Sequence, residues 1–415
     1  MFLPHLKKIV LSVCMSFCLL VFTILFAPSA PAAEVSLQPS VGITGEYNDN
    51  IDFSRVYEED DFLTRIRPAL DVDYKTDLLS LRGSGAVTVI RYLDETRRNT
   101  EYYDFGFDGA YNVTERLTAE ARFSYRKDET LESELEETGI VTFPEDRKRF
   151  NGGGGVVYSL TERDDIGLSF DHTQTDYDSV NDVDYDTDSL FLTYNHVLAN
   201  MKDVVTVKTG YAAYDSDASQ VDNYSLYLGW AHPFTETLQL SCFLGARYTS
   251  TDYFSVKQGL VFDSSLLPGY PYRTVFQRVE ASDSGWGGLA DISLKKTGED
   301  YSGTIGYNQD LTYSSQGDPI NRYKFYFDGK KNITSRLSLG FTAGAYLSKS
   351  EGEFSQEDSR HLDLGTSLNY KLTETYSLSV AYNYSYHKDK TVSENQGYDR
   401  NRVWLHLLCR FPKKW

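Results

Sequence analysis

The chain has 415 residues, and its 60 Asp and Glu outnumber its 41 Lys and Arg, which gives a formal net charge of −19. A surface this acidic excludes non-specific nucleic-acid binding, which requires clustered basic residues that displace phosphate counterions. Tyr (32) and Phe (23) are abundant, whereas only four Cys occur, and two of these, Cys14 and Cys18, lie near the start, which excludes a disulfide-stapled secreted domain.

Residues 1–32 have the pattern of a secretory signal peptide. Lys7 and Lys8 form a basic start, residues 9–27 are an uncharged and mostly apolar run, and Ala30-Pro31-Ala32 supplies small residues before a cleavage site. The alternative is an uncleaved helical anchor, since about 20 apolar residues suffice to span a bilayer. We expect the leader to be removed and residues 33–415 to form one exported domain.

Apolar and polar residues alternate with period two along most of the remaining chain. Residues 117–126 are an example, with apolar side chains at odd positions and polar ones at even positions, and residues 103–111 and 376–385 repeat the pattern. This period is typical of strands with one apolar face. We predict 18 strands, near residues 36–48, 62–75, 78–92, 101–113, 115–128, 150–160, 164–176, 185–198, 203–215, 221–233, 236–249, 283–296, 299–313, 320–331, 335–349, 358–371, 374–388 and 400–411.

The connections between these strands fall into two kinds. Five are variants of one short turn that contains a threonine, at residues 112–116, 159–163, 233–237, 332–336 and 371–375. Others are long and acidic, at residues 58–61, 132–137 and 176–188, and the longest spans about 250–284. Short turns at one end and long loops at the other predict an up-and-down meander, and an even strand number puts both termini at the short-turn end. This is the arrangement of an outer-membrane β-barrel, with short periplasmic turns and long acidic extracellular loops.

A soluble β-sandwich or solenoid is the alternative fold, and the position of the charges argues against it. The charged residues occupy one face of the strands, and the other face carries almost none through its middle. A basic residue that faces lipid at mid-bilayer costs about 2–4 kcal/mol, so a membrane barrel requires this strict alternation. We therefore predict a transmembrane barrel of about 18 strands, which is wide enough for an aqueous lumen. The predicted lumen-lining residues are Arg65, Arg67, Asp71, Arg82, Asp104, Glu120, Arg122, Asp171, Lys208, Asp291, Lys324, Asp328 and Asp363.

A resemblance to a known family begins just after the leader. The first strand ends in Tyr47-Asn48-Asp49-Asn50-Ile51, and Arg65-Ile66-Arg67-Pro68 follows in the next. Together with the repeated turns, these residues resemble the β-barrel porin family found beside exopolysaccharide and exosortase loci in Gram-negative bacteria. The resemblance implies a pore of the cell outer membrane associated with polysaccharide export, and it supplies no catalytic residues.

Candidate chemical sites are few. His361 with Asp358 and Asp363, or His387 with Asp389, is the strongest catalytic candidate, but loop histidines near acids are usually only solvated, and we predict no enzyme. The aspartates between 176 and 188 are suitable oxygen ligands for Ca²⁺ or Mg²⁺, although we favour a hydrated acidic loop. We expect no metal and no cofactor, and we interpret Cys242 and Cys409 as unpaired lipid-facing residues of strands that are not neighbours.

The longest connection is too apolar for a free outer loop, and we expect it to fold back as a constriction that includes Phe262, Leu266, Tyr270 and Tyr272. The predicted function is a porin-like conduit that exports a polysaccharide. The expected partners are outer-membrane lipid, the barrel-assembly machinery, a polysaccharide and periplasmic export components. The alternative is a non-transporting surface or structural protein whose acidic loops bind cations or extracellular matrix.

Overall fold

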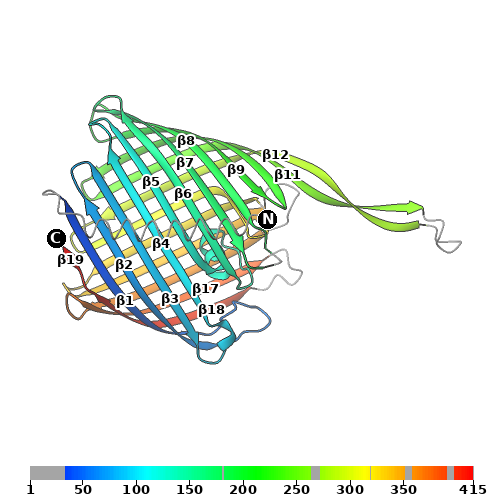
Figure 1. The fold of residues 1–415 in the computed structure, drawn as a ribbon, viewed down its shortest axis with the longest axis horizontal. Coiled ribbons are helices and arrows are strands. Elements are labelled where there is room, and N and C mark those ends of the chain that lie inside the picture. The colour runs from blue at the N-terminus through cyan, green and yellow to red at the C-terminus, as the bar shows by residue number, and fades with distance from the viewer. Residues whose placement is uncertain are drawn as a thin grey trace.

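The computed structural model describes residues 33–179, 182–262, 272–317, 319–350, 358–389 and 397–414, and only the backbone of 254–262 and 272–280. The predicted leader, residues 1–32, lies outside the described residues. The described chain forms one antiparallel sheet in which β1 pairs with both β2 and β18, so the sheet closes into a barrel (Figure 1). The predicted 18-strand up-and-down barrel is confirmed.

Each strand pairs with its neighbours in chain order. The strands are β1 (Glu34–Asn48), β2 (Asp61–Lys75), β3 (Leu79–Tyr92), β4 (Thr100–Asn112), β5 (Leu117–Glu129), β6 (Asp146–Ser159), β7 (Asp164–Tyr177), β8 (Tyr185–Val197), β9 (Val204–Ser216), β10 (Ser219–Thr235), β11 (Leu238–Phe262), β12 (Tyr272–Thr297), β13 (Tyr301–Tyr313), β14 (Pro319–Asn332), β15 (Leu337–Ser350), β16 (Asp358–Lys371), β17 (Tyr376–Asp389) and β18 (Tyr398–Arg410). A two-residue strand, β19 (Lys413–Lys414), pairs with the start of β1. The helices are η1 (Thr96–Arg98) and α2 (Thr130–Glu137), and in the described part of the chain neither they nor any other helix is long and apolar enough to cross a bilayer.

The repeated threonine turns all connect an even-numbered strand to the next odd-numbered one, so they lie at one end of the barrel. In the turn between β4 and β5, the Thr114 hydroxyl accepts hydrogen bonds from the backbone amides of Arg116 (3.2 Å) and Leu117 (3.0 Å). Thr334 and Thr373 accept the equivalent pair of bonds in their own turns. The threonine therefore satisfies backbone donors that a two-strand turn otherwise leaves free, which is why the motif repeats.

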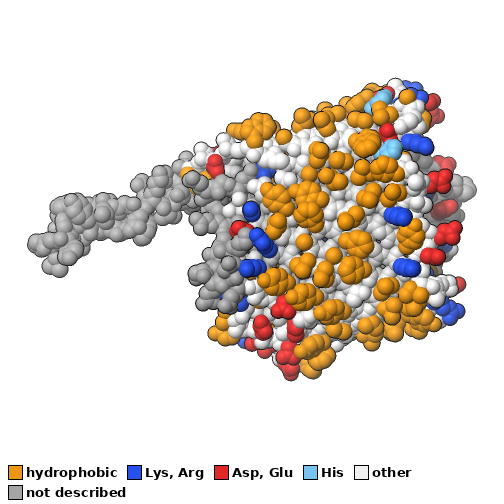
Figure 2. All heavy atoms as spheres, turned by 180° about the vertical axis from the view of Figure 1, so that it is seen from behind, with side chains coloured by type: hydrophobic (Ala, Val, Ile, Leu, Met, Phe, Trp, Pro, Cys, Tyr) orange, Lys and Arg blue, Asp and Glu red, His pale blue; other side chains and the backbone are white. Residues whose placement is uncertain are grey.

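The outer wall of the barrel is apolar. Leu226, Leu228 and Ile305 expose 51%, 62% and 57% of their surfaces, and many other large apolar side chains of the wall are similarly exposed. Figure 2 shows hydrophobic side chains spread over the wall, with charged side chains gathered toward the two ends. Apolar area on this scale is unfavourable in water, so the wall requires a hydrocarbon surrounding.

The longest predicted connection differs from the expectation. Residues that were expected to form a loop continue the strands, and Ser250 to Phe262 of β11 pair with Tyr272 to Ser284 of β12. Figure 1 shows this pair of strands running beyond the rim of the barrel as a two-stranded ribbon. Along the ribbon each strand bonds the other through one edge, and water can satisfy the backbone groups of the outer edge, so the strands need not stop at the membrane boundary.

Candidate functional site

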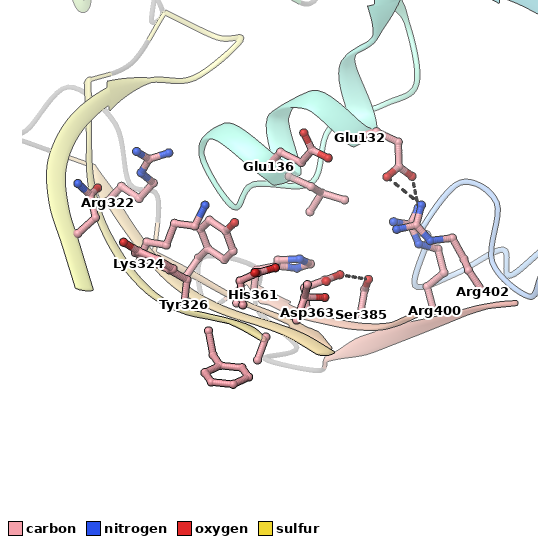
Figure 3. Close-up of a pocket in the computed structure, with 18 of the residues that line it drawn as sticks. Glu132, Glu136, Arg322, Lys324, Tyr326, His361, Asp363, Ser385, Arg400 and Arg402 are labelled. Carbon is pink, nitrogen blue, oxygen red and sulfur yellow. Dashed lines mark hydrogen bonds and ion pairs between the residues drawn. The ribbon is translucent and has the colours of Figure 1, made fainter. Parts of the chain in front are cut away.

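The connection between β5 and β6 folds back into the barrel and carries the helix α2 inside it (Figures 1 and 3). Thr130 closes the neck of this loop, because its hydroxyl donates to the Phe143 carbonyl (2.6 Å) and accepts from the Glu145 amide (2.9 Å). At the other end the Thr138 hydroxyl donates to the Glu134 carbonyl (2.8 Å) and satisfies an acceptor of the last helical turn. The loop is therefore a defined structure within the lumen.

One face of α2 is apolar and buried. Leu131 and Leu135, one helical turn apart, pack against Phe53 of the β1–β2 loop, and all three side chains are at most 5% exposed. Phe53 adopts φ 47°, an unfavourable conformation for a bulky residue, and Asn50 holds the surrounding loop through hydrogen bonds to the backbone of Ser54 (2.9 and 2.8 Å). A second loop is therefore constrained to clamp the helix.

The first turn of α2 is held by β18. Each oxygen of the Glu132 carboxylate accepts a hydrogen bond from a different arginine, Arg400 (2.7 Å) and Arg402 (3.0 Å) (Figure 3). Enclosure alone would raise the pKa of this carboxyl, but the two guanidinium groups outweigh that effect and hold the pKa of Glu132 well below its usual range. Glu132 is therefore charged at every physiological pH.

The last turn is held by β6 in the same way. Arg147 donates to both oxygens of Glu137 (3.1 and 3.3 Å), and Arg149 donates to one of them (2.5 Å). Burial raises the pKa of Glu137, but Arg149 and Arg147 outweigh that effect and bring the pKa below its usual value. On the far wall, Arg322 of β14 donates to the Glu137 carbonyl and Ser348 of β15 donates to the Thr138 carbonyl. Contacts from β6, β14, β15 and β18 thus anchor α2 across the lumen.

Glu134 differs from its neighbours on the helix. Its side chain is 1% exposed and accepts a hydrogen bond from the Tyr177 hydroxyl (3.1 Å). Burial, with repulsion from Glu137, raises the pKa of Glu134 to about 7, and Arg147 at 4.0 Å only partly offsets this. Glu134 is the group of α2 that changes charge near neutral pH.

A cavity of about 480 Å³ lies between α2 and the wall (Figure 3). Glu132 and Glu136 of the helix face it, and the wall contributes basic, acidic and aromatic side chains, among them Arg322, Lys324, Tyr326, Asp363 and Arg402. A second cavity, of about 1080 Å³, lies nearer the short turns between β14 and β18. The lumen is therefore narrowed but not filled by the helix.

The paired residues show where each predicted lumen-lining residue lies. Following the register from strand to strand places all thirteen on one face of the sheet, the face that α2 contacts. These are Arg65, Arg67, Asp71, Arg82, Asp104, Glu120, Arg122, Asp171, Lys208, Asp291, Lys324, Asp328 and Asp363. Asp291, Lys324, Asp328 and Asp363 line the cavity beside α2, and Arg67, Asp71 and Asp104 line a third one of about 250 Å³.

Several of these residues form ion pairs along the wall. Arg65 pairs with Glu46, and Arg82 donates to Asp73 (2.9 Å). Arg122 of β5 reaches Asp171 of β7 (2.6 and 2.5 Å) across the intervening Gly153. A Cβ atom at Gly153 would lie 2.1 Å from the Asp171 carboxylate, so only glycine allows this contact. The glycine run of β6 thus lets an ion pair form across a strand.

The predicted constriction was placed in a different loop from the one that enters the lumen. Phe262 and Tyr272 are the last paired residues of the β11–β12 ribbon, and Leu266 and Tyr270 lie outside the described residues. α2 was not predicted, because the acidic residues 132–137 are equally typical of a solvated outer loop. The signal that could have found it is Leu131 and Leu135, spaced four residues apart within an acidic run.

The structure also shows where the candidate catalytic residues, metal ligands and cysteines lie. Ser385 donates to Asp363 (2.8 Å), while Nδ1 of the buried His361 has no hydrogen-bond partner among the described residues, so Ser385 and His361 do not form a serine–histidine relay there. In the described part of the chain, no three His, Cys, Asp or Glu residues are grouped to hold a metal ion. Cys242 and Cys409 are free. In the sheet, Cys242 lies opposite Trp230 and Cys409 lies opposite Val41, and both cysteines are on the outward face.

Comparison with known proteins shows a similarity to a porin family over part of the chain. Residues 36–190 match the family model described as putative beta-barrel porin 2. Comparison with curated protein sequences found no match. The closed barrel, its apolar outer wall and the porin match together identify an outer-membrane barrel with porin-like architecture.

Similar solved structures include three outer-membrane proteins. OpdK from Pseudomonas aeruginosa is 10% identical, with 91% of this chain and 99% of that chain covered and a TM-score of 0.45. OccAB3 from Acinetobacter baumannii is 10% identical, with 92% and 99% covered and a TM-score of 0.45. The ferric-catecholate import receptor Fiu from E. coli K12 is 10% identical, with 92% and 82% covered and a TM-score of 0.45.

Proposed function

We propose that this porin-like barrel is a passive conduit whose width is set by α2 and that it exports a polysaccharide. The observation that carries the proposal is the way α2 is held. Charged and polar contacts from four strands fix it across the lumen, and cavities of about 480 and 1080 Å³ remain beside it and nearer the short turns. A loop that sealed the barrel permanently would instead be expected to pack against the wall as a dry core.

The lining supports a saccharide as the solute. Tyr227 and Tyr326 lie on the inner face, where aromatic rings can stack on the apolar faces of sugars, and the same face carries Asp291 and Asp328 as acceptors for hydroxyl groups. Periplasmic export components and the barrel-assembly machinery belong to this proposal as partners. We propose no catalytic role for the histidines, because the relay that a serine hydrolase needs is not formed at His361.

The projecting β11–β12 ribbon favours a second candidate function. A two-stranded ribbon beyond the rim is available to a surface partner, as a non-transporting surface or structural protein would require (Figure 1). The two functions differ in permeability, since only a conduit lets solutes cross a membrane.

Liposome swelling with the purified protein tests the conduit. The vesicles are placed in iso-osmotic solutions of neutral sugars of increasing size, from a pentose to a trisaccharide, and swelling measures their entry. We expect swelling that slows with size, and absence of swelling with all sugars favours the surface role. In the producing bacterium, deletion of the gene is expected to remove exported polysaccharide while its precursors accumulate, and unchanged export would contradict the polysaccharide assignment.

A further inference from the structure

Three of the four arginines that hold α2 also have hydrogen-bond partners on the barrel wall. Arg147 donates two hydrogen bonds to Asp128 (3.0 and 2.9 Å), and Arg149 donates to the Tyr185 hydroxyl (2.8 Å). On the other side, Arg402 donates to Asn383 (3.1 Å). The wall therefore already orients these guanidinium groups, apart from any contact with the helix.

Arg400 is fixed in a different way. Its guanidinium lies over the Phe53 ring at 4.6 Å from the centroid, and its side chain is 1% exposed. Its Nε, like that of Arg402, is buried and has no hydrogen-bond partner in the described part of the chain. Both groups carry donor capacity that Glu132 does not use, since that carboxylate takes one hydrogen bond from each arginine.

Each arginine pair thus has the form of a preorganised carboxylate receptor, and α2 supplies the carboxylates. A guanidinium that is already oriented loses little conformational entropy when it binds an anion. Glu132 and Glu137 are five residues apart on the helix, which is a rise of about 7.5 Å along its axis and a rotation of about 140° around it, so the two carboxylates point to different walls of the lumen. An elongated ligand whose carboxylates span the distance between these walls could satisfy both pairs.

We propose that the pairs Arg147/Arg149 and Arg400/Arg402 bind the carboxylates of an acidic saccharide and that Glu132 and Glu137 of α2 occupy this site until the saccharide displaces them. The inference rests on the proposed function and narrows its solute to a polymer of uronic acids. The cavity beside α2 adjoins the Arg400/Arg402 pair, and its lining adds Lys324 as a further cation and Tyr326 and Tyr346 as aromatic surfaces.

Calorimetric titration of the detergent-purified full-length barrel tests the inference without requiring conduction. The probe is trigalacturonate, and neutral maltotriose is the matched sugar. The test variant, Glu132→Gln with Glu137→Gln, frees both pairs. The control is Glu136→Gln, which removes one negative charge from the same helix. Glu136 faces the cavity and forms no ion pair among the described contacts. Heat-modifiable migration on gels verifies that each variant has folded.

We expect the double variant to bind trigalacturonate at least about tenfold more tightly than the wild type, while Glu136→Gln changes its affinity less than about threefold. Adding Arg149→Gln and Arg402→Gln to the double variant is expected to reverse the gain, and maltotriose is expected to bind equally weakly throughout. Equal affinity for the two sugars, or an equal gain in Glu136→Gln, overturns the inference. Because titration reports binding alone, these results are independent of liposome swelling, whose failure would instead reject the conduit.

Discussion

The apolar anchor of α2 gives the sharpest mutational prediction. Replacing Leu131 and Leu135 with alanine removes two side chains that are 1% and 5% exposed and that pack on Phe53. A buried Leu→Ala change costs about 2–5 kcal/mol, and the low end applies here because water from the lumen can fill the space. Two such changes amount to about 4 kcal/mol, which is nearly a thousandfold in the equilibrium between docked and undocked helix.

Hydrogen exchange measures this equilibrium in the folded barrel. In the double variant, amides of residues 130–142 are expected to exchange several hundred times faster than in the wild type at the same pH, while the strands keep their protection. The matched control replaces Leu226 and Leu228, two leucines of the outer wall that are 51% and 62% exposed, with alanine. Unchanged protection of residues 130–142 in the test variant, or loss of protection throughout the barrel, would refute the view that α2 docks as a separable element.

Three further predictions follow from individual residues. Docking of α2 is expected to weaken as pH rises from 5.5 to 8.5, because docking raises the pKa of Glu134 to about 7 and a docked Glu134 loses its stabilising proton over this range. Amide protection of residues 130–142, corrected for intrinsic exchange, measures the docking equilibrium, and Glu134→Gln should remove its dependence on pH. Gly153→Ala is expected to destabilise the barrel by about 1–3 kcal/mol and to lower its heat-unfolding temperature, because the new Cβ would collide with Asp171 and the Phe170 carbonyl. Gly45→Ala, where a Cβ meets open space, should leave that temperature unchanged. Cys242 and Cys409 should react in vesicles with a lipid-soluble maleimide and resist a membrane-impermeant one, and the reverse pattern would place them on the wrong face.

The barrel could be predicted from sequence because one physical constraint acts on every strand. A residue such as Arg122 cannot face lipid, so its neighbours Ala121 and Phe123 must, and the alternation identifies both the strand and its orientation. The same constraint placed the thirteen charged residues on the inner face. It gives no information beyond the membrane, which is why the extension of β11 and β12 past residues 249 and 283 was not predicted.

The helix α2 could not be placed from sequence for a different reason. Its acidic residues are suitable for a solvated loop and equally for a lumen rich in arginine. What decides between these is that Arg147, Arg149, Arg400 and Arg402, which are distant in sequence, converge in space. That convergence depends on which strands face each other across the barrel.

Single-channel conductance in a planar bilayer tests the central claim, that α2 sets the width of the pore, most directly. Glu129 and Asp146 are the terminal pair of β5 and β6, so residues 130–145 can be replaced by Asn-Gly, a two-residue hairpin turn, without disturbing the ladder. We expect a folded barrel whose unit conductance is severalfold larger than that of the wild type. A folded variant that conducts no better than the wild type would contradict it.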